Sequence, residues 1–151
     1  MAVRFALALL LCTPATILAQ KPDAPIGQDP ALNWAQRMFE RQNVDFGIVA
    51  RGAECKTHLK VKNLYQETIF ITNVSTSCGC SAAKPSSNQI LSGQEAYIEI
   101  SMDTVRFMRE KTSAALVTLS EPTKGLSLEV RIPLKVYIRT DVVFSPGVVS
   151  F

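Results

Sequence analysis

The chain has 151 residues, of which 47% are hydrophobic and 19% charged. This length and composition are typical of one globular domain and exclude a disordered chain and a collagen-like fibre. The net charge of +3 comes from 16 basic and 13 acidic residues, and no basic cluster is long enough to predict nucleic-acid binding. The single histidine leaves little material for histidine-based catalysis or for a multi-histidine metal site.

Residues 1–19 have the layout of a secretory signal peptide. Arg4 supplies a positive charge, an apolar stretch runs from Phe5 to Leu18, and the small Ala19 precedes a polar segment. The apolar stretch is too short to span a bilayer, which takes about 20 residues, so a cleaved leader is the better interpretation. We expect cleavage after Ala19, export to the periplasm, the cell envelope or the medium, and a mature chain without a transmembrane segment.

The segment between the leader and the first strand divides into two parts. Residues 20–30 contain three prolines and show no periodicity, which predicts a linker. Leu32, Ala35 and Phe39 then recur at helical spacing, so we expect a short amphipathic helix over residues 31–41. Its apolar side chains should seal one end of the following domain rather than bind a partner.

From Val44 to Ile138 the hydrophobic period changes to two, which indicates half-buried β-strands. The predicted strands cover residues 45–49, 54–63, 68–74, 96–102, 112–119 and 128–138. In the second of these, alternation places Cys55 inward and the only histidine, His58, outward among lysines. Pro133 has no backbone N–H to donate, so the last strand should lie at a sheet edge or bend there.

These strands predict an all-β fold. About seven short antiparallel strands with turn sequences between them, over residues 42–141, favour an immunoglobulin-like β-sandwich, with a closed barrel as the alternative. The apolar segment 142–151 ends in Val149-Ser150-Phe151, which echoes Val44-Asp45-Phe46 about one domain earlier. We expect residues 142–151 to form a C-terminal strand that is a candidate start of a second repeat. Deleting this segment should then lower self-association and leave the first domain stable.

Several short sequences together resemble a bacterial protein family. They are Asp45–Gly52 (DFGIVARG), Asn63 at a strand end, the isoleucine-rich strand Ile69–Val74, and Ser77-Cys78-Gly79-Cys80. In this order they are similar to the domain of unknown function 1573 family, exported proteins related to the ASPM/SPD-2/Hydin group of immunoglobulin-like domains. Ser81 stands where members of that family usually carry threonine. The resemblance covers residues 34–151 and implies a fold and an exported protein, but no established activity.

Three cysteines follow the leader: Cys55, Cys78 and Cys80. In an oxidising exported environment, nearby cysteines form structural disulfides by default. We favour a bridge from Cys55 to Cys78 or Cys80, because a bridge between Cys78 and Cys80 closes a very small ring. The other interpretations are that small ring, a soft-metal site in which His58 or a methionine joins the pair, and three unpaired thiols. If Cys55 is bridged, its replacement by serine should destabilise the fold by about 2–4 kcal/mol.

The sequence contains no triad, phosphate-binding glycine loop, paired carboxylates or zinc-protease motif. We therefore predict no catalytic, cofactor-binding or metal-binding residues and no enzymatic activity. The favoured function is a non-enzymatic envelope module with a structural, spacer or adhesion role. We expect a protein partner that binds at an exposed β-edge, and we expect no binding to nucleic acid. The alternative is a periplasmic thiol-redox or soft-metal-handling protein that uses Cys78 and Cys80.

Overall fold

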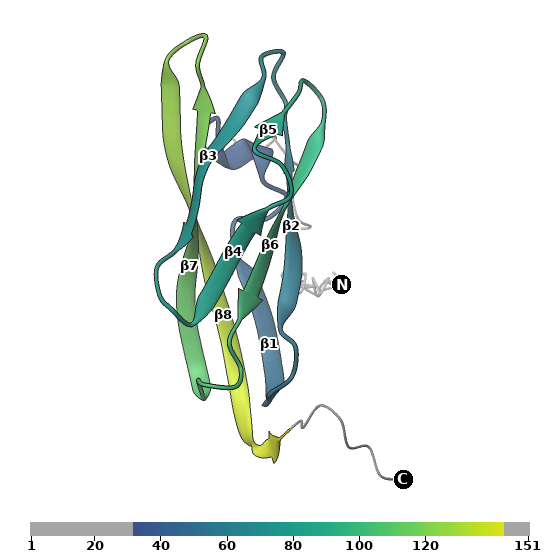
Figure 1. The fold of residues 1–151 in the computed structure, drawn as a ribbon, viewed down its shortest axis with the longest axis vertical. Coiled ribbons are helices and arrows are strands. Elements are labelled where there is room, and N and C mark those ends of the chain that lie inside the picture. Colours follow the sequence, from purple (N-terminus) through teal and green to yellow (C-terminus); the bar gives the residue numbers. More distant parts are fainter. Residues whose placement is uncertain (1–31, 144–151) are drawn as a thin grey trace, which may run out of the picture.

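The computed structural model describes residues 32–143, which form a two-layer β-sandwich (Figure 1). In chain order the strands are β1 (Val44–Arg51), β2 (Lys56–Lys62), β3 (Ile69–Thr76), β4 (Ser81–Pro85), β5 (Gln89–Ile90), β6 (Glu95–Met102), β7 (Arg109–Glu121) and β8 (Leu126–Val143). One sheet has the order β1-β8-β7-β3-β5 and the other β2-β6-β4. The predicted immunoglobulin-like sandwich is confirmed. The predicted leader 1–19, the linker 20–30 and residues 144–151 lie outside the described residues.

Alternating side chains of both sheets build the core between them. On β6 and β8 every second side chain is buried: Ala96, Ile98, Ile100 and Met102, and Val130, Ile132, Leu134, Val136 and Ile138. This period of two is the pattern that predicted the strands. The short strands β4 and β5 were not predicted, because the segment that contains them is rich in proline, serine and asparagine and favours a turn.

Strand β8 occupies a central position in the five-stranded sheet. It pairs antiparallel with β7 from Leu126 to Ile138 and parallel with β1, whereas the other strand pairs are antiparallel. Pairing with β1 begins at Leu134, opposite Val44. Pro133 precedes this point, so β8 is paired there with β7 on one side and with no strand of residues 32–143 on the other. The proline therefore sits at a local edge of a strand that is otherwise central, which is compatible with its missing N–H.

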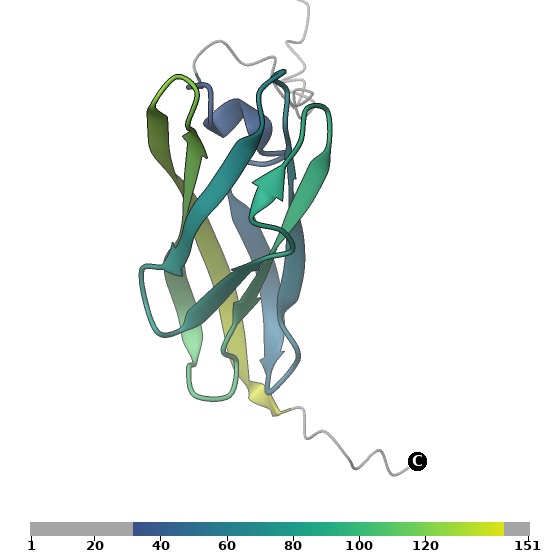
Figure 2. The same cartoon turned by 45° about the horizontal axis from the view of Figure 1, so that its top comes forward.

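The predicted helix over residues 31–41 is wrong. Over residues 32–41, the described part of this segment, the only helical element is a 3-10 turn, η1 (Gln36–Met38), at the upper end of the sandwich in Figure 2. The helix does not continue because Phe39 is extended and forms a β-bridge with Val61 at the free edge of β2. Burial of the apolar side chains at this end of the core is nevertheless as expected, for Ala35, Met38 and Phe39.

Asn63 holds the loops at the same end of the molecule together. Its side chain is fully buried, and Nδ2 donates to the carbonyl oxygens of Glu67 (2.7 Å) and Ile90 (2.9 Å). Its Oδ1 accepts a hydrogen bond from the Tyr65 N–H at 2.9 Å. One amide thus joins the loop after β2 to strand β5. The hydrogen bonds of this amide are made inside the protein, where a polar group left without a partner lowers the stability of the fold.

We predict that Asn63→Ala destabilises the fold by about 2–4 kcal/mol, because it leaves buried carbonyl and N–H groups without partners. Urea unfolding measures this loss as a lower midpoint. The matched control is Asn73→Ala, since Asn73 is exposed on β3 and its replacement should change stability by less than about 0.5 kcal/mol. Equal effects of the two substitutions would contradict the assigned role of Asn63.

Candidate functional site

The segment Ser77–Cys80 is the corner at which the chain leaves the five-stranded sheet and enters the three-stranded sheet. The Ser77 N–H donates to the Ala114 carbonyl on β7 at 2.9 Å. On the other side, the Asp103 N–H just after β6 donates to the Cys80 carbonyl at 2.8 Å. This corner is therefore hydrogen-bonded to both sheets.

A disulfide joins Cys78 and Cys80, whose Cα atoms are 5.3 Å apart, and Cys55 is a free, buried thiol. The favoured bridge from Cys55 is thus wrong. The physical reason is the strand order: Cys55 and Cys80 lie on opposite sides of β6, with Met102 next to Cys55. Two strand spacings separate their Cα atoms by about 10 Å, which exceeds the reach of a disulfide of about 7 Å.

Four hydroxyl groups surround the corner; Ser77 and Ser81 belong to the motif found in the sequence, whereas Thr76 and Ser113 were not identified from it. The Thr76 hydroxyl lies 3.1 Å from the Cys78 carbonyl oxygen and 2.9 Å from that of Ser81. The Ser113 hydroxyl on β7 is 2.7 Å from the Ser81 hydroxyl and 3.3 Å from that of Ser77. These hydrogen bonds hold the turn in place without involving the sulfur atoms, so the corner does not depend on the disulfide alone.

The three sulfur atoms differ in their exposure. Cys78 is half-buried, whereas Cys80 and Cys55 are 4% and 5% exposed. Burial raises the pKa of the Cys55 thiol, against the smaller opposing effect of the Met102 backbone amide. A thiol whose pKa is raised carries little thiolate at neutral pH and is a poor nucleophile. Cys55 therefore behaves as part of the core.

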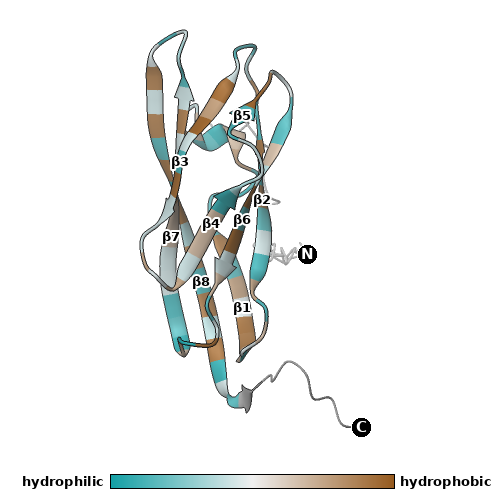
Figure 3. Ribbon diagram, viewed as in Figure 1, coloured by the Kyte–Doolittle hydropathy of each residue, from teal (hydrophilic) through white to brown (hydrophobic). Residues whose placement is uncertain are grey.

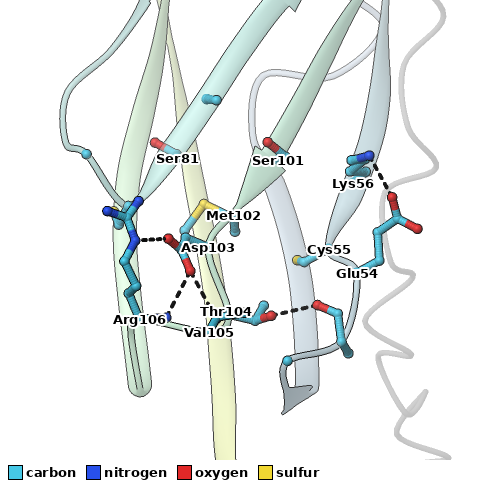
Figure 4. A pocket seen from close by; sticks show the side chains of 15 residues that line it. Glu54, Cys55, Lys56, Ser81, Ser101, Met102, Asp103, Thr104, Val105 and Arg106 are labelled. Carbon is cyan, nitrogen blue, oxygen red and sulfur yellow. Dashed lines mark hydrogen bonds and ion pairs between the residues drawn. The ribbon is translucent and has the colours of Figure 1, made fainter. Parts of the chain in front are cut away.

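A cleft of about 580 Å³ opens beside the corner (Figure 4). Two charged pairs lie on its walls: Glu54 with Lys56, at 2.6 Å, and Asp103 with Arg106. The hydrogen bond from Lys56 lowers the pKa of Glu54, and the Arg106 backbone N–H is the main cause that lowers the pKa of Asp103. Since these charges are paired, the cleft presents no unbalanced charge from either pair.

The remaining candidate ligand, His58, lies away from the corner. Its side chain is 62% exposed on the outer face of β2, and its Nε2 is 3.6 Å from an oxygen of Glu99. The expected outward orientation is confirmed. Within residues 32–143, no three histidine, cysteine or acidic side chains are grouped to hold a metal ion. In the same range, no helix has the length and apolar character needed to cross a membrane.

The sequence from Met38 to Ile132 matches the family described as Protein of unknown function (DUF1573). The chain belongs to this family. Both Asn63 and the Cys-Gly-Cys corner lie inside the matched range. No curated protein matches the sequence.

Solved structures from distant sources share the fold. The ASH/PapD-like domain 7 of human CEP192 has a TM-score of 0.58 at 11% identity, over 83% of this chain and 98% of that one. A Porphyromonas gingivalis W83 protein of unknown function has a TM-score of 0.55 at 17% identity, over 64% and 44%. The Pseudomonas aeruginosa CupB2 chaperone has a TM-score of 0.54 at 14% identity, over 68% and 56%. The match therefore spans less than half of the Porphyromonas protein, and at these identities the likeness establishes the fold alone.

We predict that Cys55 makes stability fall at high pH. An acidic group whose pKa is higher in the fold than in the unfolded chain stabilises the fold only while it is protonated. The contribution is complete below the ordinary thiol pKa of about 8.5 and decreases as pH rises above it. Unfolding free energies of the native chain and of Cys55→Ala, measured between pH 7 and pH 10, should converge at the alkaline end. Parallel pH profiles would show that Cys55 is not a buried, free thiol.

Proposed function

We propose that the protein is an exported, non-enzymatic module of the cell envelope that binds another protein at the open edge of β1. The leader-like residues 1–19 support export, and a disulfide in the structure is compatible with an oxidising compartment. A sandwich has sheet edges that can accept an additional strand, which is a common mode of peptide recognition. The question is therefore which edge is accessible.

Three of the four sheet edges are obstructed. Strand β5 has two residues, and β4 begins at the disulfide corner and ends at Pro85. The edge of β2 is covered by the preceding segment, because the Glu40 N–H donates to the Lys60 carbonyl at 3.1 Å beside the bridge of Phe39. Short strands, proline and covering loops are the devices by which proteins protect edges from association.

Strand β1 is the remaining edge, and its lower part is hydrophobic (Figure 3). Gly47, with φ of +67°, forms a bulge that shifts the register between Asp45 and Ile48. After the bulge, Ile48 is 70% exposed, the largest exposure of a large apolar side chain in residues 32–143, and its partner on β8 is Tyr137, 44% exposed. This pair is the observation that carries the proposal, since an exposed apolar edge favours strand addition.

A protein partner is also supported by the Pseudomonas aeruginosa CupB2 protein, which shares the fold and is a chaperone. The thiol-redox alternative has one observation in its favour. The Cys80 N–H donates to Cys78 Sγ at 3.1 Å, and such a bond would stabilise a thiolate on Cys78 after reduction. We rank it second because Cys80 is buried. In thiol–disulfide exchange its sulfur would have to carry a negative charge away from water, which burial disfavours.

We predict that Ile48→Lys weakens partner binding at least about tenfold, because it places a charge where about 1.5–3 kcal/mol of apolar burial would arise. A photo-crosslinking amino acid at position 137 reports the contact in intact cells as a discrete adduct. The adduct should be lost with Ile48→Lys and retained with Leu126→Lys, since Leu126 is 43% exposed at the opposite end of the sandwich.

Both substitutions change exposed side chains, so the urea midpoint of each variant should match that of the native chain. An adduct that forms equally well with Ile48→Lys would overturn the assignment of the β1 edge. A crosslinker at position 126 that gives the same adduct would do so as well.

A further inference from the structure

The loop between β6 and β7 has a backbone held by hydrogen bonds on several sides. An Asp103 carboxylate oxygen accepts from the N–H groups of Val105 (3.0 Å) and Arg106 (2.9 Å). Thr104 is 3% exposed and donates to the Ala53 carbonyl at 2.6 Å, as Figure 4 shows. The Arg51 side chain donates to the Val105 carbonyl at 3.3 Å. The loop is therefore preorganised rather than loosely attached.

This fixed loop nevertheless exposes two apolar side chains. Val105 is 62% exposed and Met108 is 45% exposed. Phe107, between them, is half-buried and packs against the core, so it anchors the loop from inside. Because the loop is rigid, it cannot turn these apolar side chains inward to bury them. They therefore form an exposed apolar surface of the kind that marks an interaction site.

Cations gather around the same apolar groups. The Arg106 guanidinium lies 5.9 Å from the centre of the Phe107 ring, and Lys111 Nζ lies 5.7 Å from it. Arg109 has φ of +62°, a left-handed conformation that side chains with a Cβ rarely adopt and that concentrates at functional sites. In the described range, neither Arg109 nor Lys111 forms an ion pair, while Glu110 is paired with Lys135 at 3.6 Å.

We propose that the β6–β7 loop docks on an anionic lipid surface. In the docked state Val105 and Met108 enter the headgroup region, and Arg109 and Lys111 face lipid phosphates, while Arg106 stays paired with Asp103. Exposed apolar side chains surrounded by basic ones are the chemistry that binds such an interface, through apolar burial and attraction to anionic lipids.

The position of the loop favours a membrane over an acidic protein. It lies at the lower end of an elongated sandwich, where β8 also ends (Figure 1). A stable protein interface takes about 800 Å² from each partner, whereas the exposed apolar surface of this loop consists of Val105 and Met108, next to Arg109 and Lys111. The β1 edge and this loop carry separate observations, so the proposal goes beyond the proposed function and stands independently of it.

The test uses the full chain, labelled with an environment-sensitive fluorophore at Met108→Cys. Cys12, which lies in the predicted leader, is replaced by serine so that it does not take the label. Among residues 32–143 the native cysteines are a disulfide pair and a buried thiol, so the introduced cysteine takes the label. We expect a blue shift, and quenching by a lipid-borne quencher, with phosphatidylglycerol vesicles and not with phosphatidylcholine vesicles. A label at Leu126→Cys, which matches Met108 in exposure, should not respond.

In the chain labelled at position 108, Arg109→Gln and Lys111→Gln should each raise the vesicle concentration for half-maximal response about fivefold. Lys124→Gln, in the hairpin turn at the opposite end, removes a positive charge that is paired with Glu67 and should leave that concentration unchanged. No response at position 108, or equal responses at 108 and 126, overturns the proposal. A response to soluble polyglutamate as large as that to vesicles would indicate an acidic protein surface and overturn it too.

Discussion

The disulfide between Cys78 and Cys80 closes the turn in which the chain passes from one sheet of the sandwich to the other. A loop this small removes little entropy from the unfolded chain, about 1.6 kcal/mol in the chain-entropy relation. The larger effect is geometric, because the corner is hydrogen-bonded to β7 through Ser77 and to the residue after β6 through the Cys80 carbonyl. Fixing this turn fixes how the two sheets lie over the core, and β4 begins where the corner ends.

The two ends of the sandwich are fixed by different chemistry. At the upper end, the buried amide of Asn63 joins the loop after β2 to strand β5. At the lower end, the Asp103 carboxylate holds the backbone of the β6–β7 loop itself, and the Thr104 hydroxyl holds that loop against the turn after β1. With both ends held, the apolar groups that stay in solvent, on β1 and on the lower loop, are features of a rigid scaffold. This is the arrangement expected of a module whose function is binding.

The elements that could be predicted from sequence are those whose signal is local. Alternation along β6 and β8 predicts both the strands and the buried face, and alternation along residues 54–63, at β2, places Cys55 inward and His58 outward. The strand-end Asn63 belongs to the sequence pattern that indicated the family. These predictions succeed because the pleat of a strand depends only on neighbours in the chain.

The failures involve contacts between distant segments. The helix over residues 31–41 is interrupted because Phe39 pairs with Val61, which local periodicity does not report. The disulfide depends on strand order: β6 separates Cys55 from Cys80, and no local pattern places β6 between them. The hydroxyl of Ser113 reaches the corner from a strand more than thirty residues away. The sequence motif therefore located the corner correctly, but it could not predict the disulfide and the hydrogen bonds that hold the corner.

The connectivity of the cysteines tests the central claim most directly. The chain is unfolded without reduction, treated with an alkylating reagent, digested and analysed by mass spectrometry. The account predicts that Cys55 is alkylated, and that Cys78 and Cys80 are found in one unalkylated peptide whose mass rises by two hydrogens on reduction. Protection of Cys55 together with alkylation of Cys78 or Cys80 would contradict it.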